Sequence, residues 1–211
     1  EFGISPQKIS LSSIKNWDSD IYEKIITYSE REIPYKLVEA TKMAKDLVDN
    51  KNEKVIIWSS FRRNMDIFEN QLLKEYNPIL IHGDVSKDPV ADDSTIMNRD
   101  KLIVEFKENP DRKILIATPA SLAESVSLHI NSKKEKVCSH AIYFDRNYNG
   151  AQFMQSMDRI HRLGMAKNTK VEYHFIMANN TIDEEIDKRL WEKFTVMSDA
   201  LNDPWPRTLD Y

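Results

Sequence analysis

Short apolar runs alternate along the chain with longer stretches in which apolar residues recur every three or four positions. The short runs are rich in β-branched residues and apolar throughout, which is typical of strands buried on both faces of a sheet. The longer stretches gather their apolar side chains on one face of a helix. Strands are predicted at KVIIW (54–58), PILIH (78–82), KILIA (113–117), HAIYF (140–144) and KVEYHFIM (170–177).

Helical spacing predicts the segments around these strands. Pro34 suits a first helical turn, and apolar residues follow it at helical spacing as far as Asn50. Further helices are expected over residues 64–76, from a cap at Ser94 or Thr95 to about Asn109, in the Ala- and Ser-rich stretch before HAIYF, over residues 155–165, and from Thr181 onward with Ile182, Ile186, Leu190 and Phe194 on one face.

This alternation predicts an α/β fold in which helices cover both faces of a mostly parallel sheet. The first residues are polar with weak periodicity, and the opening Glu1-Phe2 pair is typical of a cloning scar. We therefore expect a lead-in segment at residues 1–33, the α/β lobe at residues 34–180, and a C-terminal amphipathic helix and tail at residues 181–211.

Polar residues follow several of the predicted strands directly. Ligands of parallel α/β folds bind at the carboxyl ends of the strands, so these residues are expected to share one rim. They are Ser59-Ser60-Phe61, His82-Gly83-Asp84, Thr118 and Asp145-Arg146.

The segment QSMDRIHRLGM (155–165) carries two arginines and a histidine within an amphipathic pattern. Gln155, Arg159 and Arg162 recur at i, i+4 and i+7, which at roughly 100° per residue places them on one stripe of a helix. Two interpretations follow. The rigid guanidinium forks suit a shared phosphate, whereas Asp158, four residues before Arg162, suits an ion-paired helix face.

Composition narrows the class of protein. The 211 residues are 41% hydrophobic, enough for one sizeable core, and the net charge is -4, so any nucleic-acid contact must come from a local basic cleft. The single cysteine, Cys138, excludes an internal disulfide. No apolar run approaches the roughly 18 residues of a membrane span, and no signal pattern opens the chain, so we expect a cytoplasmic protein without a membrane partner.

Missing motifs exclude other functions. The four glycines, Gly3, Gly83, Gly150 and Gly164, form neither a P-loop nor a dinucleotide-binding turn, so the chain cannot cradle a nucleotide by itself. Ser121 and Ser125 lack the elbow of a serine hydrolase. His129, Cys138 and His140 raise the question of a metal, and Cys138 and His140 are expected to share one strand face. A structural zinc needs four ligands, so no metal site is predicted.

The segment QSMDRIHRLGM resembles motif VI of the superfamily-two helicases, and in particular of the Swi/Snf-type DNA translocases. KVIIWSSF is similar to motif IV, HGDVS resembles the segment after the next strand, and ILIATPASLAESVSLH lies where motif V is expected. AIYFDRNYNGAQF resembles the stretch that leads into motif VI through Asp145, Tyr148 and Asn149. The resemblance runs from about Pro34 to Leu190 and implies the second RecA-like lobe, a three-layer α/β/α domain.

The sequence departs from the family at two places. Where motif V usually carries a pair of glycines and a later Gly-x-Asn, this chain has what looks like one extra residue and the set Ser121, Leu122, Ser125 and Ser127. Met165 replaces the last glutamine of motif VI. These changes indicate a divergent branch, expected to be bacterial or phage-related.

The resemblance implies an ATP hydrolase that acts as a DNA helicase or translocase. Arg162 would be the arginine finger, Arg159 would hold the same phosphate, and Gln155 would orient the pair or touch the nucleotide. The residues implied to contact backbone phosphates of double-stranded DNA are Ser60, Arg62 and Thr118. Helix capping stays the alternative for Ser60 and Thr118.

ATP and its Mg²⁺ are expected to be held mainly by an N-terminal RecA-like lobe of the same polypeptide. The chain by itself is therefore expected to be inactive and to bind no cofactor tightly. A lobe that has lost motor function and serves as a protein or nucleic-acid interaction module stays open as an alternative. An RNA helicase lobe is disfavoured by the His-Arg-Leu-Gly ending of motif VI.

Overall fold

The computed structural model describes Glu23 and residues 32–86, 98–122, 126–161 and 170–201. The chain divides into two units, Glu1–Tyr35 and Lys36–Tyr211, and the sheet lies in the second. Within the described part, no helix is long and apolar enough to cross a membrane.

The second unit is built on a five-stranded sheet with the order β2-β3-β1-β4-β5. All four strand pairings are parallel. The strands are β1 (Lys54–Trp58), β2 (Ile79–Ile81), β3 (Ile114–Ala117), β4 (Cys138–Tyr143) and β5 (Glu172–Phe175). Each of them overlaps a predicted run, and the predicted α/β class with a parallel sheet is confirmed.

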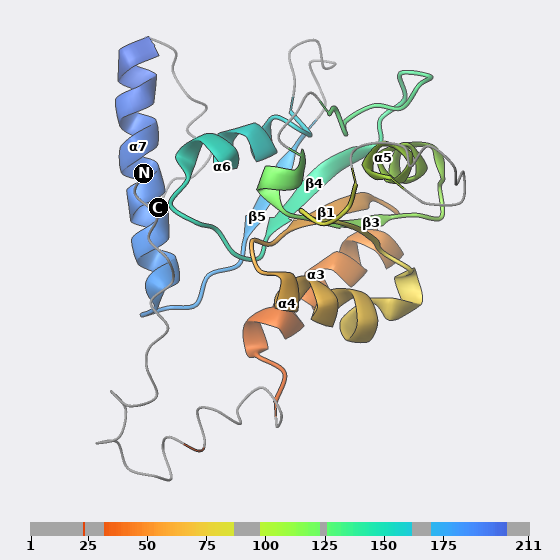
Figure 1. Cartoon of the computed structure of the whole chain (residues 1–211), viewed down its shortest axis with the longest axis horizontal. Helices are drawn as coiled ribbons and strands as arrows, with labels where there is room; N and C mark the ends of the chain where they lie inside the picture. The colour runs from red at the N-terminus through yellow and green to blue at the C-terminus, as the bar shows by residue number, and fades with distance from the viewer. Residues whose placement is uncertain (1–22, 24–31, 87–97, 123–125, 162–169, 202–211) are drawn as a thin grey trace. The chain divides into compact units, whose positions relative to one another are not determined.

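Helices cover both faces of this sheet, with α3 and α4 on one face and α5 and α6 on the other (Figure 1). The helices are α3 (Tyr35–Asp49), α4 (Arg62–Ile67), α5 (Arg99–Glu108), α6 (Gly150–Met157) and α7 (Ile182–Leu201). Shorter turns are the π-helical turn Phe68–Leu72 and the 3-10 turns Lys74–Tyr76 and Pro119–Leu122.

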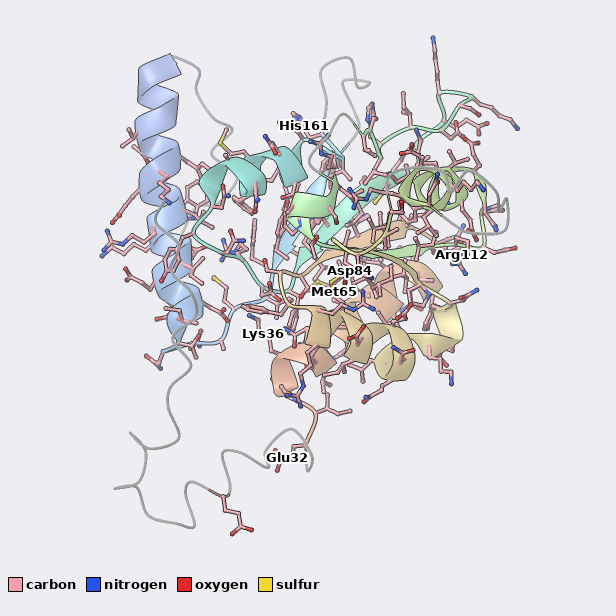
Figure 2. All side chains as sticks on the ribbon, in the orientation of Figure 1. Glu32, Lys36, Met65, Asp84, Arg112 and His161 are labelled. Atoms are coloured by element: carbon pink, nitrogen blue, oxygen red, sulfur yellow. The ribbon has the colours of Figure 1, made fainter. Side chains whose placement is uncertain are left out.

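The strands separate two hydrophobic cores. Ile56 and Trp58 of β1 point into the core shared with α5, α6 and α7, whereas Val55 and Ile57 point into the core shared with α3 and α4. Met65 in α4 belongs to the second core, and His161, which follows α6, lies on the other side of the sheet (Figure 2). Burial on both faces explains why the central strands β1 and β3 are apolar almost throughout instead of alternating.

Helix α7 packs against the core of α5 and α6 through Ile186, Leu190 and Phe194, as the periodicity predicts. Ile182 is 61% exposed, so its expected place on the buried face is wrong. The helix is also tied down by a buried ion pair between Arg146, just beyond β4, and Asp187. The Arg146 guanidinium lies over the ring of Phe175, 4.7 Å from its centroid, which covers the charge with an aromatic face.

Two predicted helices differ in their bounds. The cap of α5 is Asn98, whose side chain accepts a 2.9 Å hydrogen bond from the Lys101 backbone N–H, and not Ser94 or Thr95, which lie outside the described residues. The helix expected over residues 64–76 begins at Arg62 and widens into the π turn after Ile67. Helical periodicity does not distinguish an α turn from a π turn over so few residues.

A bulge in β4 overturns the expectation that Cys138 and His140 share a strand face. Lys54 pairs with Cys138 and Val55 with His140, so Ser139 is an extra residue. Cys138 therefore packs in the core of α5 and α6 and donates from its thiol to the Lys54 carbonyl at 3.3 Å. His140 lies two residues before Ile142, so both side chains are on the same face of β4, the face covered by α3. Burial raises the pKa of the Cys138 thiol to about 12.

Candidate functional site

The carboxyl ends of four neighbouring strands form one continuous rim, as predicted. The backbone N–H of Ser59 donates to Ala117, that of Thr118 to Ile81, and that of Phe144 to Trp58, at 3.0 to 3.1 Å. These bonds continue the sheet one residue beyond its strands. Side chains that follow β1, β2, β3 and β4 are thereby brought to a single edge.

The Asp145 carboxylate joins the ends of β1 and β4. It accepts 2.6 Å hydrogen bonds from the hydroxyl of Ser59 and from the backbone N–H of Ser60, and a 3.4 Å bond from the Asn64 side-chain amide. Asp145 is 9% exposed, so both strong bonds are shielded from water. The carboxylate fixes the turn between β1 and α4. The position of Asp145 directly after a predicted strand indicates a rim residue. The sequence does not indicate which groups donate hydrogen bonds to its carboxylate.

Ser60 does not cap α4. The N-cap position is Phe61, which makes no side-chain capping bond. Among the described residues, the Ser60 hydroxyl has no hydrogen-bond partner, and its oxygen is buried. With Asp145 and Gln152, Ser60 lines a cavity of about 10 Å³, space for at most one water molecule. Contact between this hydroxyl and a DNA phosphate therefore requires the side chain to rotate.

Thr118 makes the hydrogen bonds expected of a helix cap, which is the alternative to a role in DNA binding. Its hydroxyl donates to the Ser121 hydroxyl at 2.8 Å and accepts a 3.3 Å bond from the Ser121 backbone N–H, at the start of the 3-10 turn Pro119–Leu122. The Ser121 hydroxyl also reaches the carbonyl oxygen of Ile81 at 3.0 Å. The altered motif V thus uses its serine to join the ends of β2 and β3.

Arg62 is an exposed cation at this rim. Its Nε donates to Asp66 at 2.7 Å within α4, and both side chains are nearly half exposed. Such an exposed pair contributes about 0 to 1 kcal/mol, so exchange of Asp66 for a phosphate costs little. Burial, and then the charge of Arg62, lower the pKa of His82 beyond β2. Arg62 therefore presents a positive charge to this edge, whereas burial favours the neutral form of His82.

A buried arginine that the sequence did not single out shapes the loop after β2. Arg99 is 7% exposed, and its guanidinium donates to the carbonyl oxygens of Val85 at 3.0 Å and His82 at 3.3 Å. An arginine in the first turn of a helix normally faces solvent. The role of Arg99 in holding this loop is therefore visible only from the packing of α5 against it.

The helix expected over residues 155–165 is wrong for residues 158–161, because α6 ends at Met157 and a turn over residues 158–160 follows. Residues 162–165 lie outside the described residues. The Tyr173 hydroxyl donates to the carbonyl oxygen of Met157 at 3.0 Å, and the Leu128 backbone N–H donates to that of Arg159 at 2.8 Å. Both carbonyl groups therefore have partners outside the helix, which removes the need for a further helical turn.

Gln155 and Arg159 consequently lie in different surroundings instead of on one stripe. Gln155 is exposed on α6, whereas Arg159 is 5% exposed and donates from Nη1 to the carbonyl oxygen of Val126 at 3.0 Å. Arg162 lies outside the described residues, and so does any pairing between Asp158 and Arg162. Arg159 thus anchors the second half of the motif V segment through Val126 and Leu128.

Residues 39–164 match the family described as the helicase conserved C-terminal domain. The chain is 29% identical over 163 residues to the chromatin-remodeling ATPase INO80 of Candida albicans, covering 74% of this chain and 10% of that protein. It is 26% identical over 164 residues to the Zorya protein ZorD of Escherichia coli, covering 76% of this chain and 14% of that protein. The crystal structure of the C-terminal part of the Fun30 ATPase domain superposes with a TM-score of 0.57 at 25% identity, over 74% of this chain and 44% of the other.

Proposed function

Because the chain belongs to the family of helicase conserved C-terminal domains, we propose that it is the second motor lobe of an ATP-dependent translocase on double-stranded DNA. The resemblance to the second RecA-like lobe of Swi/Snf-type proteins is confirmed by the family match and by the Fun30 structure. The observation that carries the proposal is the shared rim, where Arg62, Thr118 and Asp145 each lie just beyond a strand at the carboxyl edge of the sheet.

In this proposal, one lobe binds the nucleotide and the other supplies positive charge to its phosphate. The 211 residues contain no P-loop, so an N-terminal RecA-like lobe of the same polypeptide would hold ATP and Mg²⁺. The chain spans only 10% and 14% of the two relatives above, which leaves ample length for such a lobe in proteins of that kind. This chain would supply positive charge to the phosphate from the opposite side.

In this division, Arg162 is the arginine finger, which acts on charge that develops on the transferred phosphoryl group. Arg159 is a positioning residue as well as a candidate phosphate contact, because its guanidinium and its carbonyl oxygen both hold the segment at Val126 and Leu128. Gln155, exposed on α6, is free to turn toward the nucleotide or the finger. Opening and closing of the two lobes would accompany each hydrolysis event.

Contacts to DNA would come from the β1 and β3 ends of the rim. Arg62 is exposed and pairs only weakly within its helix, so it can meet a backbone phosphate directly. Ser60 and Thr118 would add hydrogen bonds to the same backbone after their hydroxyl groups turn outward. Phosphate contacts position a protein on the duplex without reading bases, which suits stepping along any sequence.

The test is ATP hydrolysis by the full-length protein with and without duplex DNA. We expect turnover that duplex DNA stimulates, and no turnover from these 211 residues alone. DNA-stimulated hydrolysis by the 211-residue chain, free of contaminants, would contradict the division of labour.

The second candidate, an interaction module without motor function, is favoured by the altered motif V. Ser121, where the family carries glycine, is 7% exposed, and its hydroxyl is engaged with Ile81 and Thr118. The same measurement separates the two functions. A full-length protein with an intact P-loop lobe that binds ATP but never turns it over supports the interaction module.

A further inference from the structure

Three potential metal ligands gather on the α3 face of the sheet, on the neighbouring strands β4 and β5. His140 of β4 is in register with Glu172 of β5, and Ile142 with His174. Cross-strand partners share a face, and so do residues two apart on one strand. The three side chains therefore point the same way.

The distances within this trio match a tetrahedral metal site. His140 Nδ1 lies 3.4 Å from His174 Nε2, and the Glu172 carboxylate lies 3.6 Å from the first nitrogen and 3.8 Å from the second. Ligands bound at about 2.0 to 2.2 Å in a tetrahedron are roughly 3.3 to 3.6 Å apart. The trio therefore outlines one slightly expanded triangular face of such a site. It is the one group of this kind among the described residues.

The protonation of the two histidines suits a ligand role. Burial is the first cause that lowers the pKa of His140 and of His174, although Glu172 acts in the opposite direction on both. Burial therefore favours the neutral form of both rings, which is the form that binds metal ions. Neighbouring charges of Lys51, Lys136 and Glu53 act less strongly than burial on His140.

The site is anchored on one side and open on the other. The side chains of His140, His174 and Glu172 are 9%, 22% and 47% exposed, so the histidines are held by the sheet while the carboxylate faces solvent. The ring centroids are 5.7 Å apart and the rings are 13° from parallel, so the two nitrogens face each other across the gap. A modest rotation of the rings directs both lone pairs at one ion.

We propose that His140, Glu172 and His174 form a binding site for a divalent transition metal ion, with Zn²⁺ as the ion that best fits two imidazoles and a carboxylate. Water would occupy the fourth position. The ion would cross-link β4 to the edge strand β5 and so hold β5 and the α7 segment after it on the sheet. This site is independent of the proposed motor function. The sequence does not suggest it, because the two histidines are 34 positions apart.

The test is titration of the chelator-treated 211-residue chain with ZnCl₂, followed by calorimetry, and with CoCl₂, followed by visible absorption. We expect saturation at about one ion per chain, Co²⁺ bands of tetrahedral intensity, and a melting temperature that rises with added Zn²⁺. His174→Gln should weaken Zn²⁺ binding by at least about tenfold and abolish the rise in melting temperature. His161→Gln, which removes an exposed histidine outside the trio, should leave both unchanged.

Glu172→Gln is the second variant, since its half-exposed side chain can be replaced without disturbing the core. It should also weaken Zn²⁺ binding and shift the Co²⁺ spectrum, even if His174→Gln fails to fold. The proposal is overturned if the wild-type chain binds no Zn²⁺, or if the Glu172 and His161 variants bind it equally well. In that case the trio is a hydrogen-bonded cluster between two strands and nothing more.

Discussion

The guanidinium group of Arg159 donates a 3.0 Å hydrogen bond to the main-chain carbonyl oxygen of Val126. The carbonyl oxygen of Arg159 in turn accepts a 2.8 Å bond from the Leu128 backbone N–H. A motif VI arginine is thus a structural link between two segments that are more than thirty residues apart in sequence. Loss of activity in an Arg159 variant therefore has two possible origins, and stability must be measured beside turnover.

Arg159→Ala should lower the free energy of unfolding by about 1 to 3 kcal/mol, because it removes a buried donor from the carbonyl oxygen of Val126. Urea unfolding of the 211-residue chain measures this loss. Arg189→Ala is the matched control, since Arg189 is exposed on α7 and pairs only with neighbouring glutamates. Equal stability of the two variants would show that the bond to Val126 contributes nothing.

If Arg162 is the arginine finger, as we propose, Arg162→Ala in the full-length protein should reduce DNA-stimulated ATP turnover by about 10³-fold or more, because a finger acts on charge present only in the transition state. ATP binding and the melting temperature should stay near their wild-type values. Stopped-flow nucleotide binding and calorimetry supply these controls. Near-normal turnover with an unchanged melt would make the finger assignment wrong and would favour pairing of Arg162 with Asp158.

Arg62→Ala should weaken binding of the full-length protein to duplex DNA and reduce the salt slope by about one, since one phosphate contact is lost. Stability should change by less than about 1 kcal/mol, because only the exposed pair with Asp66 is broken. Fluorescence anisotropy at several salt concentrations measures both the affinity and the slope. Arg189→Ala removes the same charge from α7, and an equal effect there would argue against a specific contact at Arg62.

Asp145→Asn should lower the free energy of unfolding by about 1 to 3 kcal/mol. The amide NH₂ group of asparagine cannot accept a hydrogen bond, so one of the groups that donate to Asp145 would lose its acceptor. The two strong bonds at risk come from Ser59 and from the Ser60 backbone N–H. Chemical unfolding at neutral pH is the measurement. Asp111→Asn, at an exposed turn, controls for loss of a negative charge. A pair of unfolding curves that coincide would contradict the bridging role of Asp145.

Cys138 should react slowly with Ellman's reagent in the folded chain. With its pKa raised to about 12, the thiol is ionised to only about one part in 10⁴ at pH 8, and the side chain is also buried. Because the thiolate fraction grows as pH rises toward the pKa, the rate should increase about tenfold per pH unit between pH 8 and 10. The same chain in guanidinium chloride is the control. A native rate equal to the denatured rate would show that Cys138 is accessible.

The sequence by itself determined the strands, the order in which they alternate with helices, and the rim. Residues 55–58 of KVIIW are all apolar because both faces of this strand contact a core, and four consecutive residues are enough to show this. Parallel strands end at one edge, so Ser59, Thr118 and Asp145 had to share a rim whatever the details of packing. Motif VI identified the family for a similar reason, because its residue types and spacings lie within one short segment.

Only the tertiary structure decided which polar groups meet. The bulge at Ser139 arises from pairing between β1 and β4, and it sends Cys138 and His140 to opposite faces. The end of α6 depends on a hydroxyl from β5, and the burial of Arg159 depends on a distant carbonyl group. Hydrophobic periodicity is a local property, because it can be recognised within one short segment of the sequence. The partner of a buried donor or acceptor is set by segments far away in the chain, so it appears only when the layers are packed.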